Sequence, residues 1–400
     1  MHAWIKASFF RWGWLLPCFL PLAQVLGRAV FTLSAIFFLA WALTSIVGEK
    51  LEVERSIVVL YGILVVAFLL GIPGAAEPDT GFKEWCKFLA YSSGAFFILA
   101  SLQRVPDAIE RLITGFGVSG LIVLATLYLM LLVHASDEDF RPSRQMLEDN
   151  LPFLTPFILY YLHEQGPKRP AFTVLALLAA ITGYIVLSQG RSALLGLVVV
   201  LVCYGALVLR WRIRTLVAVT SLITAVLIGS YGNQFVRGAW SRQAAIEAVD
   251  DLTSYRSMLW RQALAAPPNN PLVGVGMGNT SRNRSLMSMK TRRSGVVAQA
   301  KHFHNFLFDA WYETGIIGLM SLLAWLGLML RRGVRAWRSA TGLAQQHAGL
   351  FLAASMAILT SALLSFSYRS KPFAIYLFIL LAALAFLDQS RLRSHECSQR

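Results

Sequence analysis

Long apolar runs separated by short polar segments recur along the whole chain. A helix of about 20 apolar residues crosses the hydrocarbon core of a bilayer, and its backbone groups bond within the segment. The pattern therefore predicts an all-α polytopic integral membrane protein with about twelve transmembrane helices. The predicted spans are residues 8–26, 29–47, 56–72, 83–102, 112–134, 151–163, 171–188, 192–209, 214–230, 305–330, 348–366 and 372–388.

One long segment interrupts this pattern and divides the chain into three parts. Residues 1–230 hold about nine spans, residues 231–303 form one large extramembrane loop, and residues 304–400 hold the last three spans and a polar tail. Within the loop, "SYRSMLWRQALAA" has the spacing of an amphipathic helix, whereas "PPNNPLVGVGMGN" is typical of a turn-rich loop. We therefore expect short helices in this loop.

Composition and charge support this view and orient the spans. Hydrophobic residues make up 56% of the chain and charged residues only 14%, whereas about a quarter of a soluble domain is charged. Lys and Arg concentrate in alternate short loops, which places both termini in the cytoplasm by the positive-inside rule. The net charge of +15 thus partly reflects membrane topology, and we expect membrane lipids and no nucleic acid as partners.

The large loop falls on the outer face, yet it is basic. It carries eight arginines and two lysines against three acidic residues. A solvated basic loop is one interpretation. The preference for arginine favours another, since the planar guanidinium binds phosphate through two parallel hydrogen bonds. The basic residues are Arg237, Arg242, Arg256, Arg261, Arg282, Arg284, Lys290, Arg292, Arg293 and Lys301.

Two histidines stand where this loop enters the tenth span, in "HFHNFLFDAWYETGIIGL". A structural or interfacial role is the alternative for each. A helix N-terminus disfavours a cationic imidazolium, so we expect His304 to be neutral near pH 7, as a general base must be. Because His302 and His304 lie two residues apart, they should point in different directions on a helix. We place His304 at the span boundary and His302 in the loop.

A further arginine, Arg191, lies between two predicted spans in "LSQGRSALLGL", on the outer face. Charges at this depth are costly and commonly functional, although a snorkelling arginine that ends a helix is the alternative. The next span also offers free N–H groups at its N-terminus, where a phosphate can bind. Acidic clusters occur on the outer face only at residues 137–140 and 249–252, so we predict no metal site and no metal cofactor.

These stretches resemble the O-antigen ligase family. Its motif of His, a small polar residue, nine residues and Gly-x-x-Gly is matched by His304, Asn305, Gly315 and Gly318. "YRSMLWRQALAAPPNNPLVGVGMGN" is similar to the Arg-x-x-x-Trp stretch that ends in Pro-Leu-x-Gly-x-Gly in the wider ligase/polymerase superfamily. "SQGR" is similar to that superfamily's periplasmic arginine. The likeness covers roughly residues 187 to 319.

The resemblance implies a GT-C-like, inverting, metal-independent glycosyltransferase of the bacterial inner membrane, with its active site facing the periplasm. Such an enzyme moves O-antigen polysaccharide from undecaprenyl pyrophosphate to the lipid A–core oligosaccharide in lipopolysaccharide biosynthesis. The catalytic candidates are His304, as base or acceptor-orienting group, and Arg191 and Arg256, which would hold the pyrophosphate. The substrate-binding candidates are Arg261, Arg282, Arg284, Arg292 and Asn305.

Two rival functions remain open at this stage. An O-antigen polymerase would use the same lipid-linked donor with a second lipid-linked glycan as acceptor. A transporter of lipid-linked glycans would place charged residues at mid-membrane depth, whereas here the polar groups gather at one face. Glu313, inside the tenth span, is interpreted equally well as an intramembrane hydrogen-bond partner or as a packing residue.

Overall fold

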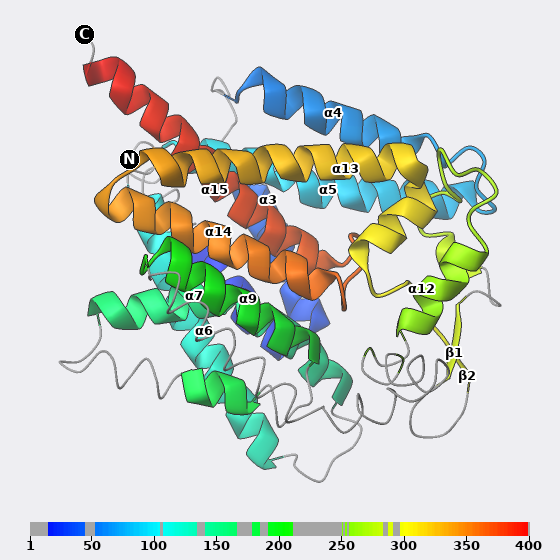
Figure 1. The fold of residues 1–400 in the computed structure, drawn as a ribbon, viewed down its shortest axis with the longest axis horizontal. Coiled ribbons are helices and arrows are strands. Elements are labelled where there is room, and N and C mark those ends of the chain that lie inside the picture. Colours follow the sequence, from blue (N-terminus) through cyan, green and yellow to red (C-terminus); the bar gives the residue numbers. More distant parts are fainter. Residues whose placement is uncertain are drawn as a thin grey trace, which may run out of the picture.

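The computed structural model describes residues 15–44, 53–104, 107–133, 141–165, 178–184, 191–210, 250, 253, 256–282, 287–290 and 297–398. Over these residues the chain is a bundle of helices with one short hairpin (Figure 1). The main elements are α2 (Leu15–Leu26), α3 (Arg28–Thr44), α4 (Arg55–Leu69), α5 (Pro78–Leu102), α6 (Ala108–Val133), α7 (Arg141–Gln165), α9 (Arg191–Leu207), α12 (Arg256–Ala265), η2 (Thr280–Arg282), β1 (Ser288–Lys290), β2 (Val297–Gln299), α13 (Phe306–Ser339), α14 (Gly342–Ala362) and α15 (Lys371–Ser398).

Five of the described helices are long and apolar enough to cross a membrane, namely α5, α6, α13, α14 and α15. Four shorter apolar helices, α2, α3, α4 and α9, lie close to predicted spans. The predicted span at 214–230 lies outside the described residues, and of 171–188 only 178–184 is described, as helix. The chain is thus a helical membrane protein, and the total of about twelve spans and the GT-C-like arrangement remain predictions.

Two helices extend well beyond the apolar runs that predicted them. The predicted span 151–163 lies within α7, which begins at Arg141, and the predicted span 305–330 lies within α13, which continues to Ser339. Both extensions are polar, with "RPSRQMLEDN" before the first run and "RRGVRAWRS" after the second. A hydropathy pattern marks only the lipid-facing length of a helix, whereas the backbone hydrogen bonds continue past it.

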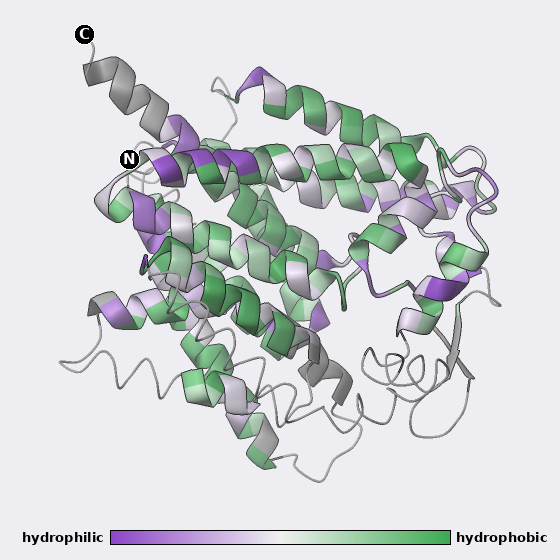
Figure 2. Ribbon diagram, in the orientation of Figure 1, coloured by the Kyte–Doolittle hydropathy of each residue, from purple (hydrophilic) through white to green (hydrophobic). Residues whose placement is uncertain are grey.

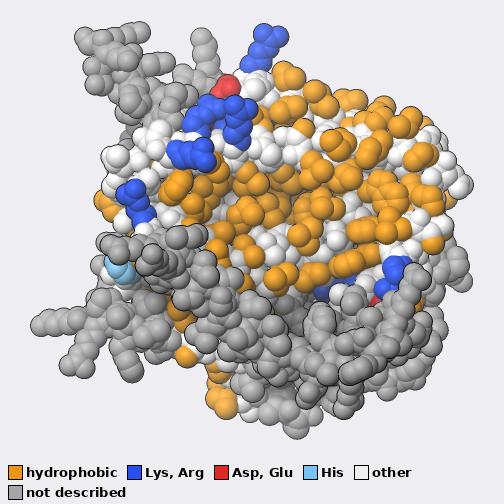
Figure 3. All heavy atoms as spheres, viewed as in Figure 1, with side chains coloured by type: hydrophobic (Ala, Val, Ile, Leu, Met, Phe, Trp, Pro, Cys, Tyr) orange, Lys and Arg blue, Asp and Glu red, His pale blue; other side chains and the backbone are white. Residues whose placement is uncertain are grey.

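Helix α15 forms the centre of the bundle. Every residue from Phe373 to Ala385 is buried, as expected for a helix that is apolar on all sides. It packs against α5, α13 and α14. Hydrophobic residues make up most of the length of the helices (Figure 2). Their side chains form a broad band across one face, with a group of Lys and Arg toward the end where α13 finishes (Figure 3).

The described part of the large loop packs at the opposite end of the bundle, where α13 begins. The predicted amphipathic helix is α12, and the predicted turn-rich segment follows it. The antiparallel pair of β1 and β2, with Met289 opposite Ala298, was not anticipated. Because each strand has only three residues, its alternation is too short to recognise in the sequence.

Candidate active site

Helix α13 is broken near its start, and the large loop fills the break. Gly315 has φ 65° and ψ −170°, values outside the helical region. The freed N–H groups of Ile316 and Ile317 donate to the carbonyls of Pro271 (2.9 Å) and Leu272 (3.2 Å). In return, loop N–H groups donate to the carbonyls that precede the break, from Val275 to Tyr312 (3.0 Å) and from Gly276 to Glu313 (2.9 Å). The exchange satisfies backbone groups that a broken helix would otherwise leave without partners.

Glycines make this docking possible. A Cβ on Gly315 would lie 2.2 Å from the carbonyl oxygen of Leu272, and one on Gly274 would lie 2.6 Å from the carbonyl oxygen of Glu313. Both residues also have positive φ values, 65° and 72°, which favour glycine. The glycines of the two sequence motifs are therefore the two sides of one contact between the loop and the helix.

The residues before α13 place His304 at the helix entrance. Asn305 is the N-cap, and its side-chain oxygen accepts hydrogen bonds from the N–H groups of Leu307 (2.9 Å) and Phe308 (3.2 Å). His304 has φ 55°, an uncommon left-handed conformation for a residue other than glycine. The predicted placement of His304 at the boundary is confirmed. Asn305 has a structural role as the cap, and its proposed contact with substrate remains a prediction.

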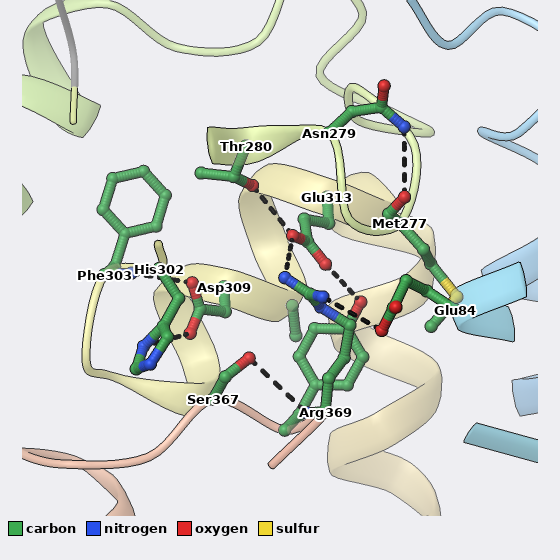
Figure 4. A network of polar contacts seen from close by, with 12 residues as sticks. Glu84, Met277, Asn279, Thr280, His302, Phe303, Asp309, Glu313, Ser367 and Arg369 are labelled. Carbon is green, nitrogen blue, oxygen red and sulfur yellow. Dashed lines mark hydrogen bonds and ion pairs between the residues drawn. The ribbon is translucent and has the colours of Figure 1, made fainter. Parts of the chain in front are cut away.

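The two histidines face each other, so the prediction that they point in different directions is wrong. Their ring centroids are 4.2 Å apart, and the N–H of His304 donates to Nδ1 of His302 at 3.1 Å. The prediction assumed helical geometry, whereas the left-handed His304 turns the chain before the helix begins. Nδ1 of His302 also lies 3.7 Å from Oδ2 of Asp309, whose Oδ1 accepts from the N–H of Phe303 at 2.9 Å (Figure 4).

Both imidazoles are held in the neutral form near pH 7. Burial, the neighbouring His302 and Arg256 lower the pKa of His304 well below 6.5, against a smaller opposing effect of the Ser365 carbonyl. Burial and the charges of Arg369, Arg256 and Lys301 lower the pKa of His302 to about 4. We expected a neutral His304, and the pKa agrees, although the first cause is burial and not the helix dipole.

Ser365, in the loop between α14 and α15, joins His304 to Arg256. Its carbonyl oxygen lies 3.3 Å from Nδ1 of His304, and its hydroxyl accepts from Nη1 of Arg256 at 3.3 Å. A carbonyl can only accept, so this contact assigns the proton to Nδ1 and leaves Nε2 as the basic nitrogen. Two of the three predicted catalytic residues therefore lie together.

Trp260 anchors the loop against the start of α13. Its indole N–H donates to the carbonyl of Phe303 at 2.9 Å, and its ring stacks on Phe308 with centroids 5.9 Å apart. Phe303 and Tyr312 form a small core with α12 and with Met287, in which Leu259 and Met287 have no exposed surface. The Arg-x-x-x-Trp motif thus combines a packing residue, Trp260, with Arg256 one turn earlier.

The remaining predicted arginines have different outcomes. Arg261 makes an ion pair with Asp250 through both carboxylate oxygens, at 2.7 and 2.6 Å, and Arg282 pairs with Glu77 at 2.5 Å. Both are exposed, and their contacts with substrate remain predictions. Arg191 is the first residue of α9, but its side chain lies outside the described part, as do Arg284, Arg292 and the acidic run at 137–140.

A buried network beside the histidines escaped the sequence analysis. Glu313 has no exposed surface, and its carboxylate accepts from Thr280 (3.0 Å), Tyr368 (2.7 Å) and Arg369 (2.7 Å). Arg369 also donates to Glu84 on α5 at 3.2 Å (Figure 4). Glu313 is therefore a hydrogen-bond partner, one of its two open interpretations. The signal was available, because an acid within a span requires a partner, and Arg369 lies in the short polar segment between the last two predicted spans.

The comparison with protein families agrees with the motifs. Residues 174–323 match the family model described as O-Antigen ligase, a stretch that includes Arg191, Arg256 and His304. This match supports membership of the O-antigen ligase/polymerase superfamily, whose members are membrane enzymes of lipid-linked glycan transfer. A comparison with curated proteins finds no match.

Proposed function

We propose that this protein is an O-antigen ligase, which transfers O-antigen polysaccharide from undecaprenyl pyrophosphate to the lipid A–core oligosaccharide. The reaction would take place at the periplasmic face of the bacterial inner membrane. The observation that carries the proposal is the placement of a neutral His304 and of Arg256 on one residue, Ser365. A base beside a cation is what transfer from a lipid pyrophosphate requires.

In this proposal Nε2 of His304 removes the proton from the attacking hydroxyl of the acceptor sugar. That oxygen forms the new bond to the anomeric carbon as the bond to the pyrophosphate oxygen breaks, so direct attack inverts the anomeric centre. Arg256 and Arg191 stabilise the negative charge that develops on the departing undecaprenyl pyrophosphate. The basic loop residues Arg261 and Arg282 contribute to recognition of the acceptor, as do Arg284 and Arg292.

Dependence on the acceptor tests this function. The purified protein is given the lipid-linked polysaccharide with increasing amounts of lipid A–core, and the products are separated by mass. A ligase yields lipid A–core that carries the polysaccharide, in proportion to the acceptor supplied. Longer lipid-linked glycan formed without acceptor would identify a polymerase, and movement of the donor across vesicles without any new glycosidic bond would identify a transporter.

A further inference from the structure

The half-helix that follows His304 is not fixed by the rest of α13. The break at Gly315 leaves residues 306–314 as a short segment at an angle to the remainder (Figure 1). Its orientation depends on the loop that fills the break and on contacts made by its own side chains. Glu313, in its last turn, makes the strongest of these, because a charged acceptor with three donors holds its partners closely.

Arg369 connects this half-helix to two other parts of the bundle. Its Nη2 donates to Glu313 at 2.7 Å and its Nη1 donates to Glu84 at 3.2 Å. Glu84 belongs to α5, and Arg369 itself lies in the loop between α14 and α15. The guanidinium side chain is only 17% exposed, and Glu313 is fully buried, so the link is shielded from water and salt.

The same loop carries the partner of both proposed catalytic side chains. Ser365 precedes Arg369 by four residues, and it holds Nδ1 of His304 through its carbonyl and Arg256 through its hydroxyl. Arg369 therefore fixes the distance between the loop that supplies the hydrogen-bond acceptor and the half-helix that follows His304. Tyr368 reinforces the link through its own bond to Glu313.

We propose that Arg369, through Glu313 and Glu84, is a positioning residue for glycosyl transfer. It keeps His304 and Arg256 in place at their shared hydrogen-bond partner, Ser365. The proposal rests on the proposed function for its kinetic consequences. A role for Arg369 as a direct ligand of the anionic donor is less favoured, because both of its terminal nitrogens are already bound to carboxylates.

The test compares this link with another buried ion pair at the other end of α13. Arg369→Met and Glu313→Gln remove the ion pair. Glu313→Gln keeps the side-chain volume and one oxygen, which can accept from either Thr280 or Tyr368, the donors to the two different carboxylate oxygens of Glu313. Arg332→Met is the control, since Arg332 is buried and paired with Asp388 at 3.4 Å at the other end of α13. Each protein is purified, and kcat and the KM for the lipid donor are measured.

A second readout reports the position of His304 without any transfer reaction. Diethyl pyrocarbonate acylates neutral, accessible imidazoles, and the modification of His304 is followed by mass spectrometry. We expect Arg369→Met and Glu313→Gln to lower kcat by about 10²-fold, the usual loss for a displacement near 1 Å, with an unchanged donor KM and faster acylation. Arg369→Lys should recover part of kcat, and Arg332→Met should leave kcat and the acylation rate unchanged.

Several outcomes would overturn the positioning role. A higher donor KM with unchanged kcat would make Arg369 a substrate ligand. Wild-type values of kcat and of the acylation rate in both variants would show that Arg369 has no positioning role. An equal loss of kcat in Arg332→Met would lead to the same conclusion. If wild-type protein transfers nothing to any acceptor, the proposed function fails, while the acylation rates still decide whether Arg369 positions His304. If Arg369→Met does not fold, Glu313→Gln decides the question.

Discussion

The two ends of α13 each hold buried charge, and they are built differently. At the far end Arg332 pairs with Glu54, with Asp388 at 3.4 Å and with Ser56 at 3.0 Å. Continuous helices supply most of these groups. At the near end, His304 is left-handed, the helix is broken at Gly315, and the large loop meets the loop between α14 and α15 through Arg256 and Ser365.

This difference separates a structural cluster from a candidate active site. Backbone strain costs free energy and persists only where surrounding contacts enforce it, which is common at sites of chemistry. The other described non-glycine residue with positive φ, Arg210, follows the end of α9, where a left-handed residue commonly terminates a helix. The strain at His304 has no such simple explanation, since it precedes a helix and brings two imidazoles together.

The largest expected effect comes from filling the helix break. Gly315→Ala would place a Cβ 2.2 Å from the Leu272 carbonyl and adds a left-handed alanine, which alone costs about 1–3 kcal/mol. Gly327→Ala, later in the same helix, meets nothing within 4 Å and should stabilise by about 0.5–1 kcal/mol. Thermal unfolding in detergent measures both, and equal Tm values would mean that the loop does not depend on the break.

The next effect concerns the geometry of the arginines. Arg191→Lys and Arg256→Lys keep the positive charge and lose the two-pronged donor. A charge-assisted hydrogen bond contributes roughly 1.5–3 kcal/mol, which corresponds to about 10- to 100-fold in rate. Transfer by each variant is measured at equal expression. Wild-type turnover would reduce that arginine to a topological or structural role.

A smaller effect is expected when the pH falls from 8 to 6. His304 must be neutral to act as a base, and its pKa lies well below 6.5, so the transfer rate should not fall in this range. In the unfolded chain the imidazole of His302 binds a proton below about pH 6.5, whereas in the folded protein it stays neutral down to about pH 4. The free energy of unfolding should therefore decrease as the pH falls from about 6.5 to about 4. A rate that halves near pH 6.5 would instead indicate an exposed, ordinary histidine.

No effect is expected from chelation. The proposed site neutralises the pyrophosphate with guanidinium groups and takes the proton with a neutral imidazole, so no step calls for a divalent cation. Transfer is measured with EDTA and again after magnesium is added. Loss of activity that magnesium restores would direct attention to the acidic runs at 137–140 and 249–252.

The sequence predicted those parts of the structure that depend on local pattern. Apolar runs located most described helices, the spacing in "SYRSMLWRQALAA" located α12, and the family motifs located His304 and Arg256. Contacts between distant segments were not predictable in this way. Ser365 lies 61 residues from His304, and nothing in its surroundings marks it as the partner of two site residues.

The break in α13 shows the same limit. Gly315 stands within an apolar run and was included in an uninterrupted span, because a glycine in a helix pattern does not by itself indicate a break. Only the loop that occupies the gap explains it. The prediction that His302 and His304 point in different directions failed for a related reason, because it assumed that both residues lie on a helix.

The most direct test of the account is to replace His304 and to measure transfer and donor binding on the same preparation. His304→Ala should lower transfer to lipid A–core by about 10²- to 10⁴-fold, the range of a general base. It should still retain the lipid-linked donor, which the arginines hold independently, and His302→Ala should be milder. Normal transfer by His304→Ala would contradict the proposed base, and loss of donor binding together with transfer would make His304 a substrate ligand or a fold element.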